Sequence, residues 1–174
     1  SGIVDLVKDG KIIGVINDGS EIGPRALGNR SIICDPSFEN MKDILNAKVK
    51  FREWFRPFAP VCRYEDKDKY FDKAYESKFM SFAPDVKEEF KSELSSITHK
   101  DGTARLQTVR EGQHGLFYDI LTEMNNRDLI SVILNTSFNI KGLPILTTLK
   151  DALHVLDNTE LDYVYSKGFL FKKK

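Results

Sequence analysis

Short runs of apolar, largely β-branched residues, each bounded by turn-forming residues, are the feature that most restricts how this sequence can fold. They cover residues 11–16, 31–34 and 130–134. Asn-Asp-Gly follows the first run, and Asp-Pro stops the second. Runs of this length and composition predict short buried strands. The sequence must therefore bring strands that are far apart in the chain into one sheet.

Segments with helical spacing separate these runs. Apolar residues recur at steps of three and four, which predicts amphipathic helices over residues 38–49, 116–124 and 149–156. Thr148 and Asp151 fit a capping box at the start of the last helix. Because strands and helices alternate irregularly, we expect an α/β fold in which helices flank a mixed sheet.

Three further segments complete the secondary-structure prediction. Residues 97–109 are strand-like, with a turn at Asp101-Gly102, and residues 162–171 form a closing strand. Residues 63–96 are rich in charge. They are predicted to be a solvated face of short helices, with a mobile excursion as the alternative.

Composition limits the kind of partner. The chain of 174 residues is predicted to form a single domain, residues 1–174. Its 26 basic residues balance 26 acidic ones, so no overall field attracts nucleic acid or a membrane, and anion recognition must be local. With no apolar run of about 18 residues and no leader pattern, a cytoplasmic location is expected. Cys34 and Cys62 are expected to be buried, reduced thiols.

Cationic chemistry is concentrated in four stretches, which lie at edges between predicted elements and loops. They are GPRALGNR (23–30), KVKFREWFRPF (48–58), HKDGTARLQT (99–108) and LNTSFNIKG (134–142). Arginine presents a planar fork of donors to phosphate or carboxylate, and Gly and Pro fix the backbone that aims it. Candidate cations are Arg25, Arg30, Lys50, Arg52, Arg56 and Arg105. Alternatively, Arg52 and Arg56 pair with acids such as Glu21, Glu53 or Asp101 and brace the fold.

Polar candidates accompany these cations. Asn135, Thr136, Ser137 and Asn139 follow a predicted buried strand, where the carboxyl ends of strands in open α/β sheets bind phosphate or sugar oxygens. A self-bonded turn is the alternative. His99, Asp101 and Thr103 are further candidates for substrate or nucleotide binding, although a histidine beside an aspartate is also typical of a structural pair. No metal-hydrolase, nucleophile-elbow or Walker A motif is present, and we predict no metal site in this chain.

In their order along the chain, the four stretches resemble the C-terminal domain of the O-carbamoyltransferases of nodulation and antibiotic synthesis, the NodU/CmcH/TobZ type. The likeness runs from about residue 11 to residue 168. It implies a YrdC-like twisted mixed sheet with flanking helices around a positively charged cavity. It also implies that the domain binds carbamoyl phosphate and ATP with Mg²⁺ and forms carbamoyladenylate. A partner N-terminal metal-binding domain of the same parent protein then transfers the carbamoyl group to a hydroxyl acceptor.

The resemblance assigns the catalytic anion-binding roles to Arg25, Lys50, Arg56 and Arg105, with Ser137 beside them. The sequence departs from the family in two ways. INDGSEIG stands before the first motif, where the family usually has a glutamine–glycine pair, and the metal-binding domain is absent from this chain. Alternative functions are a threonylcarbamoyladenylate-type synthase and a YrdC-like nucleotide- or RNA-binding module. The balanced charge argues against nucleic-acid binding.

Overall fold

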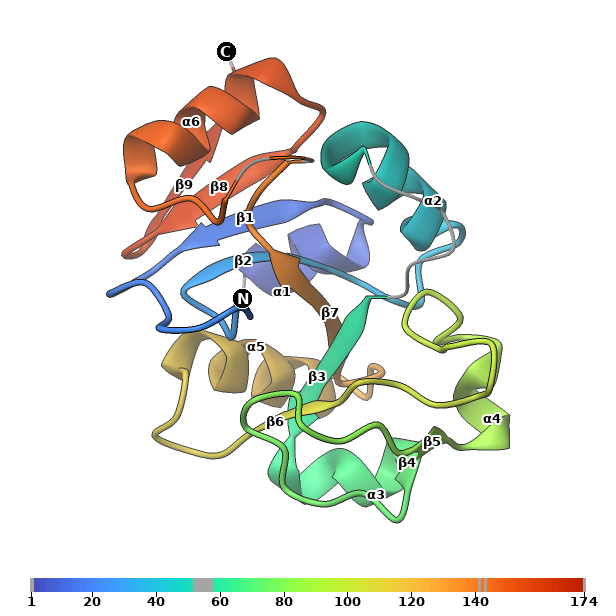
Figure 1. Cartoon of the computed structure of the whole chain (residues 1–174). Helices are drawn as coiled ribbons and strands as arrows, with labels where there is room; N and C mark the ends of the chain where they lie inside the picture. The colour runs from blue at the N-terminus through green and yellow to red at the C-terminus, as the bar shows by residue number, and fades with distance from the viewer. Residues whose placement is uncertain (1, 52–57, 141, 143, 174) are drawn as a thin grey trace.

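A twisted mixed sheet forms the centre of the protein in a computed structural model that describes residues 2–51, 58–140, 142 and 144–173 (Figure 1). Within these residues, the sheet has the strand order β6-β3-β7-β2-β1-β8-β9. Its strands are β1 (Ile13–Ile16), β2 (Arg30–Cys34), β3 (Ala59–Arg63), β6 (Gln107–Val109), β7 (Val132–Ser137), β8 (Tyr163–Ser166) and β9 (Phe169–Lys172). The β1–β8 and β3–β6 pairs are parallel, and the other pairs are antiparallel. The predicted mixed α/β fold is confirmed.

Helices cover both faces of the sheet. One face packs against α1 (Gly2–Lys8) and α5 (Gly115–Asn126). The other packs against α2 (Met41–Leu45), the π-helical turn η1 (Asn46–Lys50) that continues it, and α6 (Leu149–Asn158). Because both faces of the sheet are covered there, the central strands β1, β2 and β7 are buried along almost their whole length rather than at alternate residues.

The three predicted helices are present, with boundaries shifted by a few residues. The predicted capping box is also confirmed: the Thr148 side chain accepts from the Asp151 backbone N–H, and the Asp151 carboxylate accepts from that of Thr148. Both cysteines are buried and free, and burial raises the pKa of each thiol. In the described part of the chain, no helix is long and apolar enough to cross a bilayer.

The prediction of a solvated face of short helices at residues 63–96 was only partly right, because most of these residues are exposed or half-buried but several apolar side chains are buried. This segment folds as η2 (Tyr64–Asp66), α3 (Lys67–Tyr70), α4 (Glu88–Lys91) and a separate two-stranded sheet of β4 (Phe71–Asp72) and β5 (Asp85–Val86). Tyr70, Phe71, Val86 and Leu94 are buried in the main core. Because the elements are so short, these apolar residues follow no single period and are concealed among exposed charges.

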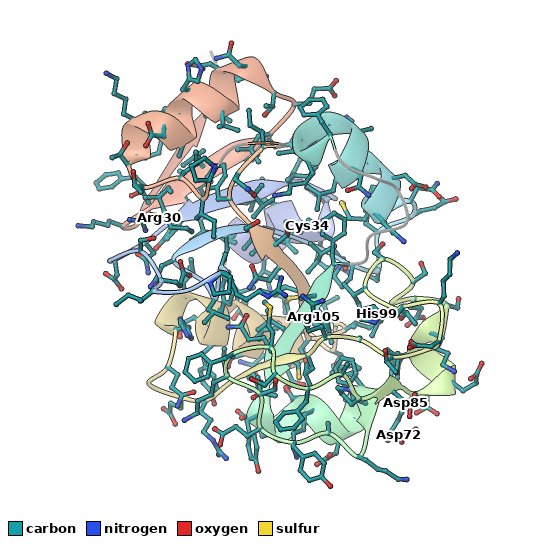
Figure 2. The ribbon with its side chains drawn as sticks, viewed as in Figure 1. Arg30, Cys34, Asp72, Asp85, His99 and Arg105 are labelled. Carbon is teal, nitrogen blue, oxygen red and sulfur yellow. The ribbon has the colours of Figure 1, made fainter. Side chains whose placement is uncertain are left out.

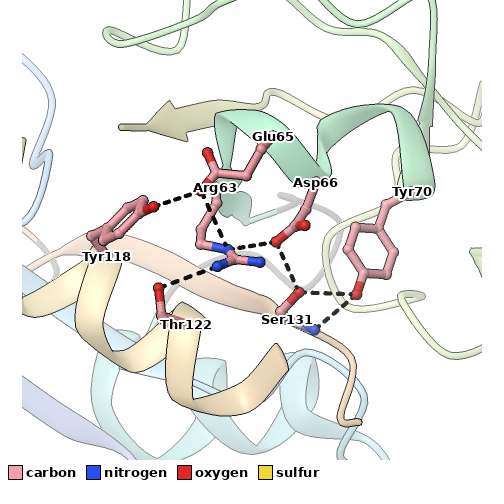
Figure 3. A network of polar contacts seen from close by, with 7 residues as sticks. All are labelled: Arg63, Glu65, Asp66, Tyr70, Tyr118, Thr122 and Ser131. Carbon is pink, nitrogen blue, oxygen red and sulfur yellow. Dashed lines mark hydrogen bonds and ion pairs between the residues drawn. The ribbon is translucent and has the colours of Figure 1, made fainter. Parts of the chain in front are cut away.

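A polar network joins this segment to the sheet (Figure 3). The Ser131 backbone N–H donates to the Tyr70 hydroxyl at 2.9 Å, and the two hydroxyl groups are 3.1 Å apart. Arg63 Nε donates to Asp66 Oδ2 at 2.7 Å, and the Arg63 guanidinium also reaches Thr122 on α5. These hydrogen bonds hold the charged segment against β3, α5 and the residue that precedes β7.

Two strand predictions also require correction. Of residues 97–109, only Gln107–Val109 joins the main sheet, because a turn in which His99 N–H donates to the Thr103 carbonyl interrupts the segment. Residues 162–171 form a hairpin of β8 and β9 rather than one strand. Lys167 and Gly168 both have positive φ, as a two-residue turn of this kind requires.

Strand β1 contains a close contact that requires a glycine. A Cβ at Gly14 would lie 2.3 Å from Cε1 of the buried Phe138 ring. We expect Gly14→Ala to lower the free energy of unfolding by about 1–3 kcal/mol through overpacking. Chemical denaturation measures this, with Gly19→Ala as the control because a Cβ there meets nothing within 4 Å. Equal stability of the two variants would contradict the expected clash.

Candidate functional site

A cavity of about 110 Å³ lies between the loop that precedes β2 and the strands β3 and β7. Its lining combines two arginines with hydroxyl, amide and apolar side chains. The lining residues are Pro24, Arg25, Ala26, Phe58, Ala59, Met80, Arg105, Asn135, Thr136 and Ser137. All four of the cationic stretches identified in the sequence therefore contribute to one cavity, although the stretch at residues 48–58 contributes only Phe58.

Arg25 and Arg105 supply the positive charge of this cavity. Burial, reinforced by the neighbouring Arg25 guanidinium, lowers the pKa of Arg105. Among the described residues, neither arginine has a hydrogen-bonded acid or an ion-pair partner. Two like charges of this kind attract an anion, which would relieve their mutual repulsion and compensate the partial burial of Arg105.

Glu21 shapes the loop that carries Arg25. Its Oε1 accepts from the backbone N–H groups of Leu27 at 2.8 Å and Asn29 at 2.7 Å. Gly28 within this loop has a φ of +135°, and a Cβ there would lie 3.2 Å from His114 Nδ1. Burial lowers the pKa of His114, and Glu21 opposes this effect. The glycine is therefore required both by backbone conformation and by packing.

Two buried amides hold the same loop against the sheet. Gln107 Nε2 donates to the Leu27 carbonyl at 2.8 Å, and Asn135 Nδ2 donates to the Ala26 carbonyl at 3.0 Å. Asn135 Nδ2 also donates to Gln107 Oε1 at 2.9 Å. Gln107 was not among the site residues predicted from the sequence. It could have been recognised as an amide side chain in a predicted strand, because a buried amide needs hydrogen-bond partners.

The prediction that Asn135, Thr136 and Ser137 follow a strand was wrong, because all three belong to β7, and only Asn139 lies beyond its end. In the register of the sheet, Asn135 lies between Ile33 of β2 and Ala59 of β3. The run VILNTS continues as a strand because its backbone pairs with β2 as far as Ser137 and with β3 as far as Asn135. These residues are consequently held more rigidly than loop residues would be.

Lys50 lies next to the cavity at the end of η1. Its buried ammonium group donates to the Ser137 carbonyl at 2.7 Å, to the Asn139 carbonyl at 2.8 Å and to Asn139 Oδ1 at 2.7 Å. Ser137 Oγ donates to the same Asn139 oxygen at 2.8 Å. Lys50 and Asn139 thus fix the end of β7 and bring a third positive charge close to Ser137.

Arg30 is placed differently from Arg25, although both belong to GPRALGNR. Its side chain is buried and donates to backbone carbonyls of Asn17, Asp18, Asn29 and Thr147 at 2.7–3.3 Å. Figure 2 shows Arg30 well away from Arg105. The geometry assigns Arg30 to the support of the surrounding loops.

His99, Asp101 and Thr103 form a turn beside the cavity. The Thr103 hydroxyl donates to Asp101 Oδ1 at 2.8 Å and lies 3.1 Å from His99 Nδ1. Burial lowers the pKa of His99; Asp101 opposes this, and Arg105 adds to it. Figure 2 shows His99 near Arg105. These three residues do not line the cavity itself.

The remaining candidates, Arg52 and Arg56, lie outside the described residues. In the part of the chain that the structure does describe, no group of three or more His, Cys, Asp and Glu side chains is arranged to hold a metal ion. The assembled site is therefore a small cationic cavity with fixed hydrogen-bonding groups. Such a site can bind a phosphorylated or carboxylated molecule and stabilise negative charge that develops on it.

Comparison with known proteins gives this site a family context. Residues 4–173 match the family described as Carbamoyltransferase C-terminus. The chain is 40% identical to nodulation protein NolNO of Sinorhizobium fredii over 100% of its own length and 26% of that protein. It is 36% identical to the 3'-hydroxymethylcephem-O-carbamoyltransferase of Streptomyces clavuligerus over 87% of its length and 29% of that enzyme. The chain thus spans between a quarter and a third of each relative.

The fold is also similar to that of solved structures. HypF of T. kodakarensis superposes with a TM-score of 0.63 at 19% sequence identity, covering 98% of this chain and 20% of that one. Full-length HypF in a phosphate- and nucleotide-bound form gives a TM-score of 0.61 at 18% identity. Together with the sheet described above, this likeness confirms the expected YrdC-like fold.

Proposed function

Because this chain belongs to the carbamoyltransferase C-terminal family, we propose that its cavity binds carbamoyl phosphate and that the domain uses ATP with Mg²⁺ to form carbamoyladenylate. The observation that carries the proposal is the pair of arginines, Arg25 and Arg105, which have no acidic partner among the described residues and lie beside the polar end of β7. A phosphate group supplies the missing negative charge.

The dimensions of the cavity favour carbamoyl phosphate as its occupant. At about 110 Å³, it is much smaller than the roughly 300–1,000 Å³ of pockets that enclose drug-sized ligands. We therefore place carbamoyl phosphate inside the cavity and the nucleotide at its mouth, where Arg25 is exposed. Arg105, deeper in the site, is then the principal phosphate ligand.

The proposed reaction has two balanced steps. Water cleaves carbamoyl phosphate into carbamate and inorganic phosphate. A carbamate oxygen then attacks the α-phosphorus of ATP, a new oxygen–phosphorus bond forms, and pyrophosphate leaves with the electrons of the broken bond. Arg25, Arg105 and Lys50 would stabilise the negative charge and align the reactants, and Mg²⁺ would accompany the ATP phosphates.

Transfer to a hydroxyl acceptor belongs to another part of the parent protein in this proposal. The relatives are three to four times longer than the matched region, which leaves room for the metal-binding N-terminal domain that the family resemblance implies. We expect this chain to perform the activation step, and the partner domain to bring the acceptor to the carbamoyladenylate.

A coupled measurement tests the proposal. The chain is incubated with ATP, Mg²⁺ and carbamoyl phosphate, and pyrophosphate, phosphate and carbamoylated acceptor are measured. We expect pyrophosphate release that requires carbamoyl phosphate, and acceptor modification only after the partner domain is added. ATP binding without any pyrophosphate release would favour a nucleotide-binding module, and unaided transfer would contradict the division between two domains.

A further inference from the structure

The side-chain oxygen of Asn135, a residue that lines the cavity, has no hydrogen-bond donor among the described residues. Asn135 is 1% exposed and lines the cavity. Its Oδ1 is buried and accepts no hydrogen bond from any residue that the structure describes. A buried polar atom of this kind is costly to leave without a partner, so a bound donor would be favoured there.

Hydrogen bonds to the backbone fix which end of the amide is the acceptor. The Leu27 carbonyl can only accept, so the Gln107 atom that faces it must be Nε2, and Gln107 Oε1 faces Asn135. The Ala26 carbonyl likewise requires Nδ2 of Asn135. Reversing either amide would place an oxygen against a carbonyl oxygen. Oδ1 of Asn135 therefore remains a fixed acceptor.

The phosphate oxygens that bind Arg25 and Arg105 act as acceptors there, so they do not also satisfy Asn135 Oδ1. A ligand that combines an anionic group with an N–H donor at its other end would satisfy both the arginines and this oxygen. Among acyl phosphates, a carbamoyl group provides such a donor through its NH₂. An acetyl group of almost the same shape has a methyl group at that position and provides none.

We propose that Asn135 Oδ1 accepts a hydrogen bond from the carbamoyl NH₂. Through this bond, Asn135 selects carbamoyl phosphate over acetyl phosphate. This inference rests on the proposed function, since it takes carbamoyl phosphate as the occupant of the cavity. It adds a specificity determinant that is separate from the arginines: they bind the phosphate end, which both acyl phosphates share.

Two stable phosphonates test the inference without turnover. Phosphonoacetamide ends in NH₂ and 2-oxopropylphosphonate ends in a methyl group, and calorimetry compares their binding to the unmodified chain. We expect the amide to bind about tenfold more tightly, the scale of one hydrogen bond in a buried site. Equal affinities would overturn the inference and leave the proposed function intact. Failure of both phosphonates and of carbamoyl phosphate to bind would instead overturn both.

A variant then assigns the selectivity to one side chain. Asn135→Ala should bring the ratio of the two affinities close to one. The ratio, and not the absolute affinity, is the readout, because Asn135 also holds Ala26 beside Arg25. Asn126→Ala, at an exposed position of α5, is the control and should keep the tenfold ratio. Retention of the ratio in a folded Asn135→Ala variant would overturn the assignment. If that variant does not fold, the comparison in the unmodified chain still decides whether the cavity selects for NH₂.

Discussion

Replacing Arg105 by methionine is expected to weaken phosphate and carbamoyl phosphate binding by about 10- to 150-fold while leaving the thermal stability of the chain unchanged or slightly higher. The loss corresponds to one charge-assisted hydrogen-bonding contact, about 1.5–3 kcal/mol. Stability is retained because burial and Arg25 already disfavour the charged form of Arg105 in the absence of ligand. Methionine keeps the apolar stem that packs in the cavity wall. Calorimetry and thermal denaturation of the same samples measure both effects.

Arg110→Met is the matched control, because it removes the same charge at an exposed position where Arg110 pairs with Glu76. We expect its phosphate affinity to stay within about twofold, apart from a small change that added salt removes. If Arg105→Met unfolds the chain, Arg105 is a structural brace rather than a ligand-binding residue. If both variants lose affinity equally, the effect is one of general charge and the cavity is not the anion site.

Replacing Asp66 by alanine is expected to have the opposite pair of effects, namely a large loss of stability with little change in phosphate affinity. The side chains of Arg63 and Asp66 are only 11% and 14% exposed, and removing the acid leaves Arg63 largely buried without its 2.7 Å partner. Breaking a buried pair in this way costs about 3–5 kcal/mol. We expect the lower end, because Glu65 remains 3.8 Å from Arg63.

Thermal denaturation should register this change as a decrease in Tm of about 6–12 °C for a chain of this size. Asp68→Ala is the control: Asp68 is 68% exposed, and its ion pair with Lys67 contributes little. A Tm for Asp66→Ala within one or two degrees of the control would contradict the structural importance of the network in Figure 3. Weakened phosphate binding by the folded variant would show that the network also supports the cavity.

The sequence predicted the strands and helices whose apolar residues form a regular local pattern. The runs at β1, β2 and β7 and the spacing of α5 and α6 are visible because both faces of the sheet are buried and each helix has one apolar stripe. The buried position of Tyr70 could not be predicted in this way, since it depends on a contact with Ser131, 61 residues later in the chain. No window of sequence contains that information.

In the candidate site, too, the sequence indicated the kind of chemistry, but the role of each residue depends on contacts between distant segments. GPRALGNR indicated an arginine-based anion site, but Arg25 and Arg30 are chemically equivalent in the sequence. Their different roles become visible only in the folded protein, because Arg30 donates to the Thr147 carbonyl, which lies 117 residues later in the chain. Asn135 is a similar case. Its free acceptor results from the orientation of Gln107 and the loop, which requires three segments of the chain to be in place.

The position of β1 between β2 and β8 also affects how the chain can fold. β2 pairs with β1 soon after synthesis of the first segment, but Ile13 meets its other partner, Tyr163, 150 residues later. Contacts of such long sequence separation close large loops and slow folding. During translation, one edge of β1 therefore stays open until almost the entire chain has left the ribosome. A nascent chain stopped before β8 would expose that edge to pairing with other chains.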